Sequence, residues 1–267
     1  VAAGHDEPLV QSAAASGQDL NWHLNNNTNA IFTLIPPDRD WDFIVLQEHS
    51  TKLTRTYTGS PSFPASVAQS QTDAVGMYQI ATNRSPNVVP VLYETWARGP
   101  GHAFYTSGNP PPYTGPSEMQ AEVRAGYNAL KSAIDTDAGS DLALIAPVGD
   151  AWENANYNQL HANDLWHAQN RGTLLAALVI YGTIYGDTST SDIDLSDILS
   201  DLGLSSADGT FLTSAADATL VPEPSAAALA VACLIGGAMT RRRPCQPNGV
   251  PQCRPIASCR ARRSCRR

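Results

Sequence analysis

The chain has no cysteine in its first 232 residues, although it has five in all. The five are Cys233, Cys245, Cys253, Cys259 and Cys265. A body without cysteine excludes disulfide bonds there and says nothing about the redox compartment. The C-terminal cysteines also lack the short paired spacing that zinc sites use. We therefore expect no cysteine-bound metal.

Basic residues are also scarce in the body of the chain. All 25 acidic residues lie at or before Glu223, and 9 of the 17 basic residues lie at or after Arg241, so residues 1–240 carry 8 − 25 = −17. The last 27 residues carry +9, which gives the net charge of −8. Binding to nucleic-acid phosphates needs a basic face. We therefore expect no nucleic-acid partner for the body.

The beginning of the chain lacks a methionine and the apolar stretch of a signal peptide, since the first methionine is Met77. Residues 1–12, "VAAGHDEPLVQS", predict the end of a helix followed by a strand. We expect that the beginning has been processed, cut or lost.

Three short apolar runs predict buried strands, at residues 42–47, 87–96 and 141–149. Helical patterns at residues 64–84 and 117–137 lie between them. Strands that alternate with helices predict an α/β domain with a doubly wound parallel sheet. The Pro/Gly-rich loop at 105–118 follows the second strand, where such folds build their sites.

The polar stretch at 186–210 predicts a surface segment with one short helix at 195–202. It leads toward a proline-flanked junction at Val221. We therefore predict a globular domain at residues 1–205 and a linker at 206–220.

Residues 221–243, "VPEPSAAALAVACLIGGAMTRRR", combine Pro222, Glu223 and Pro224 with 14 small or apolar residues and three arginines. Fourteen helical residues span about 21 Å, which is short of the ~30 Å apolar layer of a membrane. The segment closely resembles the PEP-CTERM sorting signal of Gram-negative bacteria. The resemblance implies an exported protein that is held briefly in the inner membrane by this helix, processed by an exosortase-type sorting protease, and delivered to the cell surface or extracellular matrix.

Residues 244–267 continue past the arginines at which such signals end. They are rich in Arg, Cys and Pro and share no composition with the body. A frameshift or misplaced stop codon is one explanation, and a disordered basic tail is the other.

The pair Asp164 and His167 stands just before a strongly apolar run, "GTLLAALVIYG", at residues 172–182. One interpretation is a polar helix N-terminus, because Asn163 and Asp164 are good capping residues. The other is catalytic, because an Asp three residues from a His can orient the imidazole and stabilise its protonated form.

Asp-x-x-His resembles the last sequence block of the SGNH (GDSL-type) hydrolase superfamily. "DFIVLQEHS" at 42–50 is similar to the third block in its Leu-Gln-Glu variant, and "AASGQDLNWHLNN" at 14–26 resembles the second block. "VLYETW" and "APVGDAW", at 91–96 and 146–152, are similar to strand ends in the same subgroup. The resemblance covers about residues 13–186 and implies a three-layer α/β/α, flavodoxin-like fold that lacks its first βα unit.

Carried over residue by residue, the resemblance makes His167 the general base and Asp164 its orienting carboxylate. The Gly17 N–H and the Gln47 side chain stand where the family holds the oxyanion. Gln47 replaces the family's asparagine and adds a methylene group, which changes the reach of the donor. Glu48, His49, Trp96 and His102 are the candidate residues of the cleft.

The family's nucleophilic serine, in a Gly-Asp-Ser or Gly-Asn-Ser turn, has no counterpart before Ala13. We therefore expect that a βα unit with the nucleophile is missing from this chain and that the fragment is inactive without it. Ser16 and Ser50 are weaker alternatives, because neither stands at the family's nucleophile position.

A metal site is a further alternative, since His161, Asp164 and His167 would share one face of a continuous helix. No other His or Cys partner is evident, and we assign no metal and no cofactor. The sequence thus predicts an exported serine esterase or deacetylase acting on an ester-bearing substrate, for which extracellular polysaccharide is a candidate. The alternative is a non-catalytic surface or biofilm matrix protein with the same fold.

Overall fold

A three-stranded parallel sheet runs through the part of the chain that the computed structural model describes, residues 3–60 and 63–221. Its strands are β1 (Phe43–Leu46), β4 (Val89–Tyr93) and β5 (Leu144–Ala146), in the order β1-β4-β5. Each lies inside one of the predicted runs, so these three predictions are confirmed. Because all the strands are parallel, their carboxyl ends meet at one edge of the sheet.

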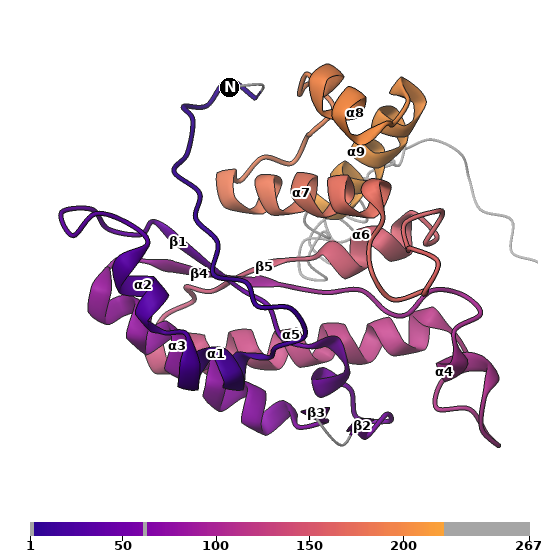
Figure 1. The fold of residues 1–267 in the computed structure, drawn as a ribbon, viewed down its shortest axis with the longest axis horizontal. Coiled ribbons are helices and arrows are strands. Elements are labelled where there is room, and N and C mark those ends of the chain that lie inside the picture. Colours follow the sequence, from indigo (N-terminus) through magenta and orange to yellow (C-terminus); the bar gives the residue numbers. More distant parts are fainter. Residues whose placement is uncertain (1–2, 61–62, 222–267) are drawn as a thin grey trace, which may run out of the picture. The chain divides into compact units, whose positions relative to one another are not determined.

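Helices cover both faces of this sheet (Figure 1). The long helices α3 (Val67–Arg84) and α5 (Pro116–Ala138) pack against each other on one face. On the other face lie α6 (Val148–Asn154) and α7 (Asn170–Tyr185). The predicted α/β class with three layers and a parallel sheet is therefore confirmed.

Local sequence signals set the ends of the two long helices. Ser66 caps α3 by accepting a hydrogen bond from the Gln69 N–H at 3.2 Å. Pro116 opens α5, where its missing N–H costs nothing. Gly139 ends α5 with a φ of 69°, a left-handed conformation that favours glycine.

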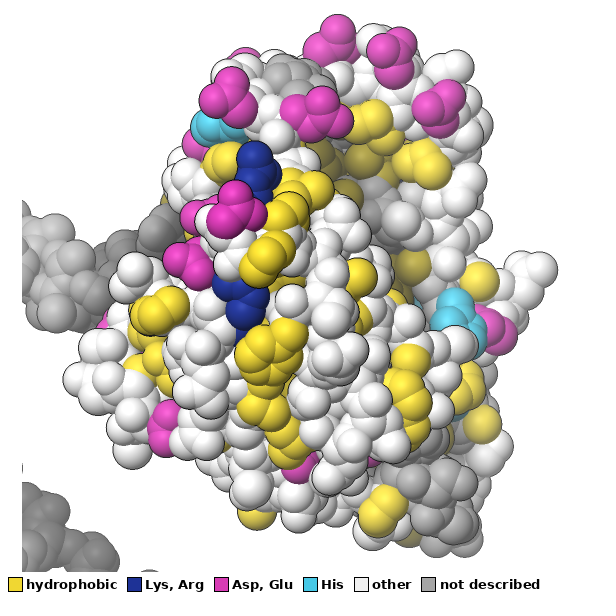
Figure 2. All heavy atoms as spheres, turned by 60° about the vertical axis from the view of Figure 1, so that its left-hand side comes forward, with side chains coloured by type: hydrophobic (Ala, Val, Ile, Leu, Met, Phe, Trp, Pro, Cys, Tyr) yellow, Lys and Arg dark blue, Asp and Glu magenta, His cyan; other side chains and the backbone are white. Residues whose placement is uncertain are grey.

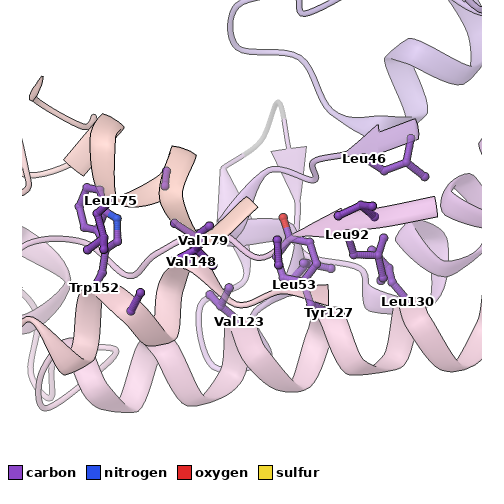
Figure 3. Packing of buried hydrophobic residues seen from close by; sticks show 14 of the residues in the cluster. Leu46, Leu53, Leu92, Val123, Tyr127, Leu130, Val148, Trp152, Leu175 and Val179 are labelled. Carbon is purple, nitrogen blue, oxygen red and sulfur yellow. The ribbon is translucent and has the colours of Figure 1, made fainter. Parts of the chain in front are cut away.

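The core between these layers is made of side chains that are almost fully buried (Figure 3). Leu46 and Leu92 are register partners on β1 and β4, and Figure 3 shows them above Leu130 of α5. On the other face, Trp152 of α6 lies beside Leu175 of α7. Burying one such side chain contributes about 1.5–3 kcal/mol, so the sheet is held firmly from both sides.

The described part of the chain also contains seven shorter elements. They are α1 (Leu20–Asn26), α2 (Asn29–Thr33), the 3-10 helix η1 (Ser50–Leu53), β2 (Gly59–Ser60), β3 (Phe63–Pro64), α4 (Ala103–Thr106) and α8 (Ser196–Leu202). The short helix predicted at 195–202 is thus confirmed as α8. Two of these elements, η1 and α4, follow the carboxyl ends of β1 and β4 and so lie where a site is expected.

The strand and helix end predicted at residues 1–12 are wrong for the residues that are described. Residues 6–15 form neither a helix nor a strand. Leu9 and Val10 are exposed there. No described strand pairs with this segment, so its apolar residues have no covered face to occupy.

The linker predicted at residues 206–220 is also wrong. This stretch is the helix α9 (Ser206–Leu220), which begins with a capping box formed by Ser205 and Asp208. Leu212 and Ala216 of α9 are fully buried, and Leu220 lies against Gly182 of α7. The domain therefore continues to the end of α9. The small residues of α9 allow it to pack closely against α7.

The predicted sorting signal, residues 221–243, lies outside the described residues except for Val221, as does the tail at 244–267. Among residues 3–60 and 63–221, no helix is both long and apolar enough to cross a membrane.

Candidate active site

Asp164 and His167 lie in a loop before α7 and hydrogen-bond to each other. The distance between His167 Nδ1 and Asp164 Oδ2 is 2.6 Å. The other carboxylate oxygen, Oδ1, accepts the backbone N–H groups of Trp166 and His167, each at 2.9 Å. Asp164 thus holds the loop and the imidazole ring together.

Backbone hydrogen bonds between its two ends close this loop. The Ala162 N–H donates to the His167 carbonyl at 2.7 Å, and the Gln169 N–H donates to the Leu160 carbonyl at 2.9 Å. Helix α7 begins only at Asn170, with Gln169 as its N-cap. Asp164 therefore does not cap the helix, and the interpretation as a helix N-terminus is wrong.

This geometry defines what the pair can do chemically. When the Nδ1–H of His167 donates a hydrogen bond to Asp164, Nε2 is the ring nitrogen that can accept a proton. The hydrogen bonds from the His167 side chain and from the His167 and Trp166 N–H groups hold the pKa of Asp164 well below its usual range. An ionised Asp164 stabilises the imidazolium that forms when His167 takes a proton. The His167 side chain is 70% exposed, so Nε2 is open to a reactant.

The segment that follows β4 holds this loop in place. Trp96 Nε1 donates to the Trp166 carbonyl at 3.0 Å, and the Gly99 N–H donates to the Leu165 carbonyl at 2.8 Å. The Trp96 ring stacks on Trp152 of α6, with ring centres 4.0 Å apart and planes 5° apart. Trp96, a predicted cleft residue, therefore braces the Asp164–His167 loop against the core.

The residues predicted at the carboxyl end of β1 are brought beside the N-terminus of α1. Glu48 is fully buried, and its Oε1 accepts the Leu20 N–H at 3.3 Å and the His49 N–H at 2.7 Å. This contact places the Gly17 turn, three residues before Leu20, next to the end of β1. Gly17 has a φ of 69° and is exposed, as is Gln47.

In the described part of the chain, no hydrogen bond joins Gly17 or Gln47 to Asp164 or His167. His49 makes the link instead. Its ring meets the Trp166 ring edge-on, with centres 6.2 Å apart, and Trp166 stacks on His167 at 5.2 Å. Burial, and secondarily the charge of Arg98, lower the pKa of His49, which favours its neutral form.

His102 lies farther along the same rim. Its Nδ1 accepts the Phe104 N–H at 3.1 Å and so caps α4. Burial and the nearby Arg98 charge lower the pKa of His102. The structure therefore places His102 at the start of α4, against the Phe104 ring.

Neither candidate serine contacts the imidazole of His167. Ser50 is buried at the start of η1 and accepts a hydrogen bond from Arg98 at 3.2 Å, while Ser16 is exposed beside Gly17. Over residues 3–60 and 63–221, no serine hydroxyl hydrogen-bonds the His167 ring.

The metal alternative does not fit the geometry. His161, Asp164 and His167 do not share a helix face, because residues 161–168 form a loop closed by a bridge between His161 and Ala168. His161 bonds the Ala97 carbonyl at 3.0 Å through Nε2 and packs edge-on against Trp152. The described residues contain no cluster of three His, Cys, Asp or Glu side chains that fits a metal ion.

Sequence reasoning missed two residues of this site, Trp166 and Arg98. Trp166 contacts both His49 and His167, and its position between Asp164 and His167 was the available signal. Arg98 is buried against Trp166, with its Cζ atom 4.5 Å from the ring centre. A lone arginine just after a buried strand was the corresponding signal.

No protein-family model matches the chain, and no curated protein matches it. Among solved structures, it is similar to a protein from Slackia heliotrinireducens described as "a putative SGNH hydrolase". The identity is 23% and the TM-score 0.46, over 63% of this chain and 80% of that one. A match at this level says nothing about activity.

Proposed function

We propose that the domain is a carboxylic ester hydrolase of the SGNH type. The observation that carries the proposal is the Asp164–His167 pair, with 2.6 Å between Asp164 Oδ2 and His167 Nδ1 and with Nε2 open to solvent. A fixed imidazole with an ionised carboxylate behind it is the general base that serine acyl transfer uses. The sequence blocks around Gly17, Gln47 and Asp164 support the same class.

In this proposal His167 takes the proton of a serine hydroxyl as the serine attacks the ester carbonyl. Asp164 stabilises the imidazolium, which then protonates the leaving alcohol and leaves the acyl group on the serine. His167 next takes a proton from a water molecule that attacks the acyl-serine, and the imidazolium returns the proton to the serine oxygen as the acid is released. The Gly17 N–H and the Gln47 amide hold the developing oxyanion, a donor pair of the kind worth about 3 kcal/mol per donor. The contact between Glu48 and Leu20 supports this role, because it keeps the two donors at one edge of the sheet.

The test uses the protein at the full length that its gene encodes. A fluorophosphonate probe reacts with an activated serine, and mass spectrometry of the labelled peptide identifies that serine. We expect labelling, and hydrolysis of p-nitrophenyl acetate, to fall on the order of 10⁴-fold or more in His167→Ala. Label on a serine of a Gly-Asp-Ser or Gly-Asn-Ser turn completes the proposed triad.

His5→Ala is the matched control, because His5 is also exposed and also lies beside an aspartate, Asp187, at 3.4 Å. It should leave labelling and hydrolysis unchanged. Label on Ser50 or Ser16 would move the nucleophile to that residue. Absence of both labelling and hydrolysis in the full-length protein would favour the alternative, a non-catalytic surface or matrix protein.

We also propose export and sorting by residues 221–243, on the sequence of that segment alone. The partner is an exosortase-type protease, and ester groups of extracellular polysaccharide are the candidate substrate. Replacing Pro222, Glu223 and Pro224 by alanine should leave the protein in the inner-membrane fraction of its host. Unchanged fractionation would contradict the sorting proposal without touching the esterase proposal.

A further inference from the structure

Arg98 is a buried cation without a buried anion beside it. It follows β4, is 4% exposed, and its Nη1 donates to the Ser50 hydroxyl at 3.2 Å. Within the described residues, no carboxylate forms an ion pair with its guanidinium, and Ser50 is the hydrogen-bond partner of its side chain there. Its Cζ atom lies 4.5 Å from the centre of the Trp166 ring and 5.9 Å from the centre of the Phe104 ring.

Such an arrangement is costly unless something else supplies the negative charge. Removing a charged group from water costs several kcal/mol, and a cation over an aromatic ring recovers only about 2 kcal/mol. Burial lowers the pKa of Arg98 to about 10, so the group is still charged near neutral pH. An arginine cannot escape the cost by losing its proton.

The surroundings of Arg98 are suited to an anion. Burial, and with it the Arg98 charge, lowers the pKa values of His49, His102 and His161, which favours the neutral form of each of these imidazoles near Arg98. Asp164, the nearby carboxylate, is engaged by His167. The Ser50 hydroxyl, which accepts from Arg98, has a proton to donate to a ligand.

The Arg98 region adjoins the Asp164–His167 pair through one side chain. The Trp166 ring contacts the Arg98 guanidinium and also stacks on the His167 ring, with planes 16° apart. An anion held by Arg98 would therefore lie close to the proposed general base.

We propose that Arg98, with Ser50, binds a carboxylate group of the substrate next to the Asp164–His167 pair. A carboxylate fits because one planar anion matches one planar guanidinium in charge and in shape. A doubly charged phosphate fits less well, since Arg98 is a single cation and residues 1–240 carry a net charge of 8 − 25 = −17. Figure 2 agrees for the face it shows, where acidic side chains are scattered and few Lys or Arg appear.

The inference rests on the proposed ester hydrolysis and narrows its substrate to carboxylate-bearing esters. The first experiment does not depend on activity. Binding of D-glucuronate and of D-glucose to the full-length protein is measured by isothermal titration calorimetry. We expect glucuronate to bind more tightly than glucose, and Arg98→Met to weaken glucuronate binding ten- to a hundredfold, as loss of a charged hydrogen bond does.

Arg98→Lys should keep part of the glucuronate binding, since it keeps the charge and loses the planar fork. Arg171→Met is the matched control, because Arg171 also lies over an aromatic ring, Phe211 at 5.1 Å, but is ion-paired with Asp208. It should bind glucuronate like the wild type. Equal glucuronate binding by the wild type and Arg98→Met, or none by the wild type, would overturn the inference.

The second experiment compares hydrolysis of O-acetyl glucuronate with that of O-acetyl glucose. The ratio of the two kcat/KM values should fall at least tenfold in Arg98→Met and stay unchanged in Arg171→Met. Hydrolysis of both esters with an unchanged ratio would reject the carboxylate site and leave the esterase proposal standing. Binding that depends on Arg98 without any hydrolysis would keep the site and reject the esterase.

Discussion

Lys52 and Arg98 are two equally buried cations with opposite surroundings. Each is 4% exposed, and each follows the carboxyl end of a strand, β1 or β4. Lys52 lies 2.9 Å from Asp19 and 3.6 Å from Glu48, both buried carboxylates. The Arg98 guanidinium donates to the Ser50 hydroxyl at 3.2 Å, lies against the Trp166 ring and pairs with no carboxylate of the described residues. The first charge is neutralised within the fold, and the second is not.

Glu94 shows a third way of burying a charge. It is 1% exposed at the end of β4, accepts a hydrogen bond from Gln120 at 2.8 Å and has Asp150 as a neighbour. Burial, and then the charge of Asp150, raise its pKa well above the ordinary value, so it can hold a proton. A lysine with partners and a protonated carboxyl are stable without a ligand. A lone arginine is not, which is why Arg98 points to binding.

The largest effect that tests this comparison is a difference between two matched variants. Lys52→Met leaves the buried carboxylates of Asp19 and Glu48 without a cation, and we expect it to lower the free energy of unfolding by about 3–5 kcal/mol. Arg98→Met removes an unpaired buried charge at a similar side-chain volume, so we expect it to leave the free energy of unfolding unchanged or to raise it. Urea unfolding of each variant measures both values.

Lys131→Met is the control for losing any ion-paired lysine. Lys131 bonds Asp135 at 2.6 Å at a partly exposed position, where such a pair contributes about 1 kcal/mol or less. Equal losses of stability in Lys52→Met and Arg98→Met would contradict the comparison between the two cations. Such a result would mean that the fold stabilises the charge of Arg98 as it does that of Lys52.

The fold was predictable from sequence where periodicity was strong. The runs containing β1, β4 and β5 are short and aliphatic, as expected for a covered sheet, although Val45 of the edge strand β1 is 44% exposed. The prediction failed at residues 206–220, because buried alanine and threonine in α9 have the composition of a linker. Small residues allow helices to approach closely, and that contact depends on α7, far away in the sequence.

The candidate site was predictable where its residues are close in sequence. Asp164 and His167 are three residues apart in the sequence, and their side chains form a hydrogen bond in the structure. Arg98 and Trp166 are 68 positions apart, and no local pattern predicts that the guanidinium lies over the indole ring. The roles of Gly17 and Gln47 still rest on resemblance, because their geometry toward a substrate depends on a reactant that the fold alone does not specify.

A smaller effect tests the third way of burying a charge. The raised pKa of Glu94 means that the folded protein keeps a proton that the unfolded chain loses above the ordinary pKa of 4.5. Stability therefore falls as pH rises through the interval between the ordinary and the raised pKa. Glu94→Gln stays neutral and should remove that part of the fall. We expect it to be about 1 kcal/mol or more stable than the wild type at pH 8, and equal to it near pH 4.5.

Urea unfolding at pH 4.5, 6 and 8 measures the difference between Glu94→Gln and the wild type. Arg124 and Asp150 are present in both proteins, and because Asp150 interacts with Glu94, the difference reports the titration of the Glu94–Asp150 pair. If the Glu94→Gln variant is less stable than the wild type at pH 8, Glu94 is ionised in the folded protein. The charge of Glu94 would then need a counter-ion, as the charge of Arg98 does. Glu94 and Arg98 could then no longer be distinguished by the argument that a buried carboxyl takes up a proton whereas a buried guanidinium cannot lose one.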